Sequence, residues 1–417
     1  MVRLIAILCL LLTSLLAVFR APAYPLWLLS VIVQSFPWIF AGAVLLLLLT
    51  GGYGGRYGLI NALASALAIV LYLSPVIRAY STARGLGPKL ELAFRVIQLH
   101  GDSGDTDLIN KGKAQMVAAQ KASPFQWQRM FTGIGAAPVP GRTLTYGSAD
   151  GVNLTLDLYP AKQPGPRPCV IVIHGGSWAE GDSRQLPELN SRLAKDGYTV
   201  AAINYRLAPR YHNPSQVQDV QAALNYLRSH AAELSIDSNT FVLLGRSAGA
   251  QIALLAAYTL QDSAIKGVID FYGPADMVWG YSAPANPLVM DSRKVMSDYL
   301  GGSYPAVPQN YLNSSPVAFV TRQSVPTLMI HGQQDVLVAY EHSTRLNRKL
   351  ADSGIKHFLL TLPWATHGFD YPERPRRPVV DVQCGKVPGN YCSLNREKKV
   401  KARMQRANPQ TPFSRSP

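Results

Sequence analysis

Short apolar segments alternate with helix-like segments after residue 140, and this alternation restricts the fold more than any other feature of the chain. The apolar segments CVIVIHG, YTVAAINY and TFVLLG have the length and composition of buried strands. Residues 216–230 between them place Val217, Val220 and Leu224 on one side of an amphipathic helix. The pattern predicts an α/β domain at residues 141–372, with a mostly parallel central sheet flanked by helices. Ligands of such sheets bind beyond the carboxyl ends of the strands, so functional residues are expected just after strands.

A serine between two glycines occupies such a position. The segment GRSAG, residues 245–249, follows the strand-like TFVLLG and precedes the helix-like AGAQIALLAAYTL. A serine at a tight strand-to-helix turn is exposed for nucleophilic attack, and Gly245 and Gly249 remove side chains that would collide with the neighbouring backbone. Ser247 is therefore the predicted nucleophile. The alternative is a glycine-rich turn that carries a serine without a chemical role.

A serine hydroxyl needs a base, and the base needs an acid that orients it. His367 lies in the loop PWATHGFD after the last strand-like segment, and Asp335 lies in HGQQD after PTLMI. We expect His367 to be the base and Asp335 the acid, with Asp276 after DFYG as the alternative acid. His331 is expected to shape the turn that presents Asp335. Four further histidines are expected at the surface: His212, His230, His342 and His357.

The segment HGGSW, residues 174–178, follows another strand-like segment. Attack on an ester makes the carbonyl oxygen negative, and inward-facing backbone N–H groups stabilise that charge. We expect Gly175, Gly176 and Ala248 to supply these N–H groups. The arrangement requires no metal or organic cofactor, and no cysteine spacing typical of a zinc site is present.

The motifs HGGSW, NYRLAP, GRSAG, YLGGS, HGQQD and THGF occur in the order found in one enzyme family. Residues 141–372 resemble the esterase and lipase branch of the α/β-hydrolases that includes hormone-sensitive-lipase-like and feruloyl-esterase-like enzymes. The resemblance implies the triad Ser247, Asp335 and His367, and a structural role for Arg206 as partner of a nearby acid. Ser177 stands where the family often has a third glycine, which puts the third oxyanion donor in doubt. The layout is also similar to that of isoprenylcysteine methylesterase.

The first 79 residues predict a membrane anchor. Uncharged apolar runs at about 4–20, 25–50 and 58–77 suggest about three transmembrane helices, the second interrupted by Pro37. An alternative for the first run is a signal peptide, which would leave two spans. Lys and Arg residues near the runs favour a cytoplasmic catalytic domain. The expected location is thus integral membrane and multi-pass.

Residues 80–140 are expected to form a connector with one amphipathic helix, and residues 373–417 a basic, disordered tail. The formal charge of +15 lies partly in this tail, and no nucleic-acid-binding signature accompanies it. Membrane lipids are expected partners of the protein, whereas for the basic tail itself solvation is the main expectation and contact with lipid head groups the alternative. Cys384 and Cys392 are either bonded or free, Cys169 is expected to be packed in a strand, and the oligomeric state is left open.

The predicted function is that of a membrane-anchored serine carboxylesterase acting on a small-molecule or lipid ester through an acyl-enzyme on Ser247. An acyltransferase, a carboxyl methylesterase or an amidase would use the same triad. A non-catalytic membrane scaffold that keeps the fold is the alternative of another class.

Overall fold

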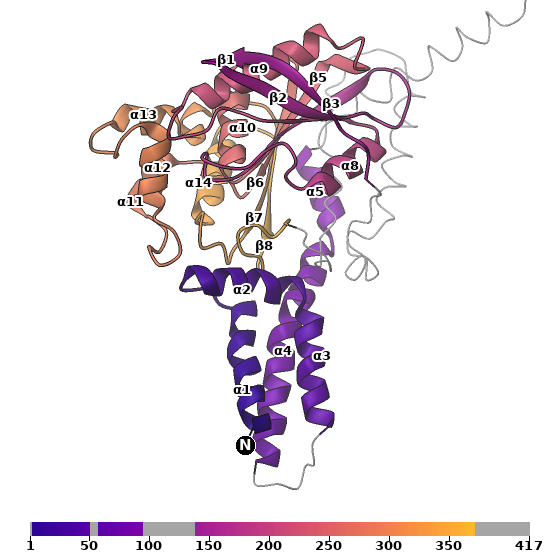
Figure 1. Ribbon diagram of the computed structural model, residues 1–417, viewed down its shortest axis with the longest axis vertical. Helices are drawn as coiled ribbons and strands as arrows, with labels where there is room; N and C mark the ends of the chain where they lie inside the picture. Colours follow the sequence, from indigo (N-terminus) through magenta and orange to yellow (C-terminus); the bar gives the residue numbers. More distant parts are fainter. Residues whose placement is uncertain (1, 51–56, 95–137, 372–417) are drawn as a thin grey trace, which may run out of the picture.

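The computed structural model describes residues 2–50, 57–94 and 138–371 and has two parts (Figure 1). Residues 138–371 form the sheet domain. Below it in Figure 1, helices α1, α3 and α4 run side by side as a helical bundle, and α2 lies across the end of the bundle that faces the sheet domain. The expected amphipathic helix of the connector, the basic tail, Cys384 and Cys392 lie outside the described residues.

The sheet domain is built on one eight-stranded sheet in the order β1-β2-β4-β3-β5-β6-β7-β8. Strands β1 and β2 form an antiparallel pair, β2 is antiparallel to β4, and the remaining neighbours are parallel. The mostly parallel sheet predicted from the alternation is therefore confirmed. The strands are β1 (Arg142–Ala149), β2 (Val152–Tyr159), β3 (Arg167–Ile173), β4 (Thr199–Ile203), β5 (Ile236–Arg246), β6 (Ile265–Phe271), β7 (Thr327–Gly332) and β8 (His357–Leu362).

The two faces of the sheet are covered by different helices, because successive side chains of a strand point to opposite faces. In β3, Ile171 and Ile173 pack in one core with α9, α10 and α14, whereas Val170 and Val172 pack in a second core with α8 and α5. The helices and 3-10 turns of the domain are α8 (Pro187–Asp196), α9 (Ser215–Ser229), α10 (Ala248–Thr259), α11 (Met277–Ser282), α12 (Ser292–Leu300), α13 (Pro308–Asn313), η2 (Pro316–Phe319) and α14 (Glu341–Asp352).

The N-terminal elements differ from three simple spans. They are α1 (Val2–Ser14), η1 (Leu15–Ala17), α2 (Tyr24–Ser35), α3 (Pro37–Leu49), α4 (Gly58–Ala83) and α5 (Leu86–Phe94). The second apolar run is not one continuous helix, because α2 and α3 meet at an angle of 83°. Pro37 explains the break, since a proline disfavours helical geometry in the preceding residue and removes a backbone donor.

Only α4, among the described helices, is long and apolar enough to cross a membrane by itself. The bent pair of α2 and α3 would add a second crossing if it were counted as one span. At 26 residues, α4 is about 39 Å long, which exceeds the hydrocarbon thickness of a bilayer.

Helix α4 joins the two parts of the molecule. Its residues Ala68 and Tyr72 belong to the core of the bundle, whereas Val76, Ala79 and Ala83 belong to the second core of the sheet domain. Part of the expected connector is thus helical and packed, since α4 continues to Ala83 and α5 packs near β8. This continuous core fixes the bundle to the sheet domain.

Candidate active site

Ser247 lies at the carboxyl end of β5, in the turn that leads into α10. Its backbone has a φ of 51°, in the region that non-glycine residues rarely adopt. A Cβ at position 245 would lie 2.2 Å from the Gly249 carbonyl oxygen, and a Cβ at position 249 would lie 2.3 Å from the His174 carbonyl oxygen. Both glycines are therefore required by the close approach of the backbone, as the sequence predicted.

The three residues predicted as a triad lie in one hydrogen-bonded row. His367 Nε2 is 3.0 Å from Ser247 Oγ, and His367 Nδ1 is 2.7 Å from Asp335 Oδ2. Because an ionised carboxylate only accepts hydrogen bonds, Nδ1–H donates to Asp335. Nε2 is then free to accept the proton of the Ser247 hydroxyl. The row has the geometry of a nucleophile, a base and an orienting acid.

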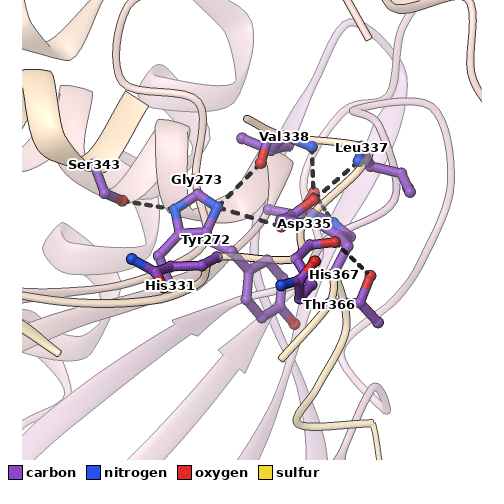
Figure 2. Close-up of polar contacts among 12 residues, drawn as sticks. Tyr272, Gly273, His331, Asp335, Leu337, Val338, Ser343, Thr366 and His367 are labelled. Carbon is purple, nitrogen blue, oxygen red and sulfur yellow. Dashed lines mark hydrogen bonds and ion pairs between the residues drawn. The ribbon is translucent and has the colours of Figure 1, made fainter. Parts of the chain in front are cut away.

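Asp335 is buried between two histidines (Figure 2). Its Oδ1 accepts hydrogen bonds from the N–H groups of Leu337 and Val338, each at 2.9 Å. Burial by itself would raise its pKa, but His367 and the hydrogen bond from His331 hold the pKa of Asp335 well below its usual range. The carboxylate is thus ionised throughout the neutral pH range.

His331 shapes the turn of Asp335, as expected. Its Nε2 lies 3.1 Å from the Val338 carbonyl oxygen and 3.3 Å from Asp335 Oδ2, and its Nδ1 lies 2.7 Å from Ser343 Oγ. The ring therefore joins the turn after β7 to α14. Figure 2 shows these contacts around the ring.

The alternative acid, Asp276, makes structural contacts. It accepts the Trp279 N–H at 2.9 Å as the cap of α11, and it pairs with Arg345 at 2.8 Å. The expectation for His342 was wrong: this histidine is buried beside Trp279, and burial lowers its pKa to about 3. The burial could not be predicted from the position of His342 in a helix, because α14 directs the face that carries His342 toward the core.

The three predicted oxyanion donors, Gly175 and Gly176 of HGGSW and Ala248 of GRSAG, differ in their surroundings. Gly176 and Ala248 line the cavity beside Ser247, and Ala248 is the first residue of α10, where N–H groups lack partners inside the helix. Within the described part of the chain, the Gly176 N–H makes no hydrogen bond. Gly176 has a φ of +124°, and a Cβ there would meet the Glu180 carbonyl oxygen at 2.1 Å.

Gly175 does not fit its predicted role. Its N–H donates to Gln185 Oε1 at 2.8 Å, and Gly175 does not line the cavity. A Cβ at this position would lie 3.0 Å from the Arg246 carbonyl oxygen, so Gly175 allows the two backbones to approach. Ser177, the next residue after Gly176, does line the cavity. The loop that carries the HGGSW motif lines the cavity through Gly176 and Ser177, whereas the Gly175 N–H is directed to Gln185.

An ion pair behind the triad was not found from the sequence. Arg246, which precedes the nucleophile, is 1% exposed and binds Asp370 Oδ2 through its Nε at 2.6 Å. Asp370 also accepts the Tyr272 hydroxyl, and the Tyr272 ring lies against the His367 ring at a centroid distance of 4.5 Å. These contacts tie the nucleophile turn to the loop that carries the base. An arginine inside GRSAG and an aspartate three residues after His367 were the only available signals.

Replacing Asp370 by asparagine is expected to lower the free energy of unfolding by about 3–5 kcal/mol, because it leaves the buried Arg246 charge without a counter-charge. Thermal unfolding of the purified protein would measure this loss. Asp298→Asn is the matched control, since Asp298 pairs with Lys294 at an exposed site and such pairs contribute at most about 1 kcal/mol. Equal melting temperatures for the two variants would contradict a structural role for the Arg246 pair.

A second buried carboxyl group, that of Asp270 in β6, makes a pH-dependent contribution to the stability of the folded protein. Burial raises its pKa to about 7, although its Oδ1 accepts the Gly273 N–H at 2.7 Å. Because the folded pKa lies above that of the unfolded chain, its contribution to stability is complete below about pH 4 and is lost as the pH rises through 7. In the Asp270→Asn variant this contribution is absent. The change in melting temperature between pH 5 and pH 8 should then be less negative than in the unchanged protein, and an identical change would contradict the assignment.

One cavity of about 860 Å³ contains the triad and the two lining donors. The aromatic residues Trp279, Tyr281 and Tyr299 are not among its lining residues, which agrees with a packing role for them. Tyr299 instead stacks on Trp178, which lines the cavity, at a centroid distance of 4.2 Å. Arg206 pairs with Asp219 at 2.7 Å, away from the cavity, as the resemblance implied. Among residues 2–50, 57–94 and 138–371, no cluster of side chains has the composition of a metal site.

Comparisons with known proteins bear on the fold. Residues 156–350 match the family model described as BD-FAE. The structure of Thermogutta terrifontis esterase 2 phosphonylated by sarin aligns with a TM-score of 0.50 at 21% identity, over 60% of this chain and 92% of that one. The Pyrobaculum calidifontis esterase aligns with a TM-score of 0.50 at 18% identity, over 68% of this chain and 90% of that one. The sheet domain has the α/β-hydrolase fold.

Several curated relatives carry esterase names, among them LipC and ICMEL1. Esterase LipC of Mycobacterium tuberculosis is 31% identical over 222 residues, which are 49% of this chain and 54% of LipC. The probable isoprenylcysteine alpha-carbonyl methylesterase ICMEL1 of Arabidopsis thaliana is 34% identical over 267 residues, 59% of this chain and 54% of that protein. The chain thus spans about half the length of these two relatives.

Proposed function

We propose that the chain is a membrane-anchored serine carboxylesterase. The row of Ser247, His367 and Asp335, with contacts of 3.0 and 2.7 Å, is the observation that carries this proposal. Relatives named as esterases support the reaction class. The substrate is a small-molecule or lipid ester, and no metal or organic cofactor takes part in the steps below.

Ser247 Oγ attacks the acyl carbon while His367 Nε2 takes the hydroxyl proton. The carbonyl oxygen becomes an oxyanion that accepts hydrogen bonds from the N–H groups of Gly176, Ser177 and Ala248. When the intermediate collapses, the bond to the leaving alkoxide breaks and His367 returns the proton to that oxygen. Water then attacks the acyl-enzyme by the same route, which releases the carboxylic acid and regenerates the Ser247 hydroxyl. Asp335 stabilises the charged imidazole in both half-reactions.

The anchor is supported by the surface of the helical bundle. Large apolar side chains are exposed along α1, α3 and α4, among them Ile5, Leu12, Leu46, Leu63 and Val70. In the described part of the sheet domain, only Leu288, Leu312 and Tyr371 are exposed large hydrophobic residues. Exposed apolar side chains on several neighbouring helices are typical of a membrane contact. Cysteine modification from either side of sealed vesicles would test the arrangement.

We propose that the catalytic domain faces the cytoplasm, because the positive-inside rule favours the side that carries more Lys and Arg. Arg20 and Arg78 donate to carbonyl oxygens of the sheet domain, those of Gln333 and Pro363. Arg84 and Lys89 follow the end of α4 that packs on the sheet domain, whereas Arg3 donates to the Leu48 carbonyl oxygen at the end of α3. Protease treatment of sealed vesicles of known orientation would test this, since a cytoplasmic domain is digested only in inverted vesicles.

Hydrolysis of p-nitrophenyl esters by the purified full-length chain tests the activity. The proposal expects release of p-nitrophenol that stops after treatment with a fluorophosphonate. Product analysis with added alcohol separates hydrolysis from acyl transfer, because an acyltransferase would form the new ester in preference to the acid. A protein that neither turns over esters nor reacts with the fluorophosphonate would be a non-catalytic scaffold.

A further inference from the structure

The cavity around Ser247 has a wall that the sheet domain does not supply. Five residues of α2 line it: Trp27, Leu28, Val31, Ile32 and Ser35. Helix α2 contains no charged residue, and four of these five side chains are apolar. The nucleophile and this apolar wall therefore face the same space, although they are more than 200 residues apart in the chain.

Contacts on both sides of the cavity hold α2 in this position. On the side of the triad, Gln34 Oε1 accepts the Thr366 N–H at 3.1 Å, and Arg20 donates to the Gln333 carbonyl oxygen at 2.9 Å. Thr366 directly precedes the base His367, and Gln333 lies two residues before the acid. The N-terminal segment is thus hydrogen-bonded to the two loops that carry the base and the acid.

On the opposite side, the Tyr24 N–H donates to the Leu288 carbonyl oxygen at 2.9 Å, and Asn286 donates to the Pro22 carbonyl oxygen at 2.9 Å. Residues 283–286 of this loop also line the cavity. Helix α2 therefore bridges the space between the triad loops and the loop after α11. Its position is that of a fixed wall and not of an independent surface helix.

Part of the apolar lining that α2 supplies is exposed. Leu28 and Ile32 line the cavity but remain 45% and 48% exposed, and Leu288 nearby is 72% exposed. Helix α2 turns by 83° from α3 and lies across the end of the bundle (Figure 1). If the bundle lies in the bilayer, these exposed side chains lie at its surface, where an apolar helix face contacts lipid.

We propose that α2 forms the acyl-binding wall of the active site, and that the substrate is an amphiphilic ester whose hydrocarbon chain enters along Leu28, Val31 and Ile32 from the membrane surface. The inference rests on the serine esterase function proposed above. It assigns specificity for chain length to α2, while the ester group lies at Ser247. Burial of the hydrocarbon chain against α2 is favourable in free energy because it removes apolar surface from water. No charged residue of α2 lies along this wall.

Substitution of one wall residue tests this. Val31→Trp places a bulky side chain on the cavity wall and narrows the cavity. Leu26→Trp adds the same side chain to an exposed position of α2 that does not line the cavity. Both variants are compared with the unchanged full-length protein in nanodiscs, with p-nitrophenyl acetate and p-nitrophenyl decanoate as substrates. For Val31→Trp we expect kcat/KM for the decanoate to fall at least about 10-fold relative to the acetate. The Leu26→Trp variant should keep the original ratio.

A ratio of decanoate to acetate turnover that Val31→Trp leaves unchanged would overturn the inference. The rate of Ser247 labelling by a small fluorophosphonate shows whether the site is assembled in each variant. If the Val31→Trp variant does not form an active site, Val31→Ala is tested instead. The smaller side chain widens the cavity, so the substrate preference should shift toward longer acyl chains. An unchanged preference would overturn the proposal. An unchanged protein without ester turnover or labelling would instead refute the proposed function.

Discussion

Replacing Ser247 by alanine is expected to lower kcat for p-nitrophenyl ester hydrolysis by about 10⁶-fold, because the acyl-enzyme can no longer form. A residual rate above that of water is expected, since the oxyanion donors and the binding cavity remain. Initial rates of the purified variant at saturating ester would measure the loss. Ser229→Ala, at the end of α9 with its hydroxyl bonded to the Tyr226 carbonyl oxygen at 2.9 Å, is the control and should retain full activity. Full turnover in the Ser247→Ala variant would remove the basis of the mechanism.

Replacing Asp335 by asparagine is expected to lower kcat by about 10⁴-fold with little change in KM. The neutral amide neither stabilises the imidazolium nor fixes the Nδ1–H tautomer, so Nε2 of His367 no longer takes the serine proton. Initial rates measured across the pH range would test this. The loss of kcat is expected at neutral pH, where Asp335 of the unchanged protein is ionised.

Asp276→Asn is the matched control for that substitution, since Asp276 was the other aspartate that the sequence allowed. It caps α11 and pairs with Arg345, and it makes no hydrogen bond to His367 within the described residues. We expect its kcat to stay within about tenfold of the original, because only structural contacts are lost. A larger loss with Asp276→Asn than with Asp335→Asn would reverse the assignment of the acid.

The residues of the triad could be predicted because each lies within a few residues after the end of a strand. Parallel strands bring their carboxyl ends to one sheet edge, so position after a strand is enough to bring Ser247, Asp335 and His367 together. Which donors face the substrate could not be predicted in this way. The Gly175 N–H is used by Gln185, a residue ten positions later whose side-chain direction depends on the folded loop.

The helical elements show a second limit of the sequence pattern. Hydropathy gives the apolar runs but not their direction, so the run at 25–50 concealed the 83° bend that separates α2 from α3. The burial of His342 and the pair of Arg246 with Asp370 depend on packing between distant elements. The role of α2 beside the triad depends on contacts more than 260 residues apart, such as that of Gln34 with Thr366.

Mapping of the fluorophosphonate adduct tests the central claim most directly, namely that His367 activates Ser247 as the nucleophile. The full-length protein is labelled in membranes, digested and analysed by mass spectrometry, next to the His367→Ala variant. We predict a single adduct on the peptide that contains Ser247, formed at least about 10³-fold more slowly in the variant. An adduct on another residue, or equal labelling of Ser247 without His367, would contradict the account.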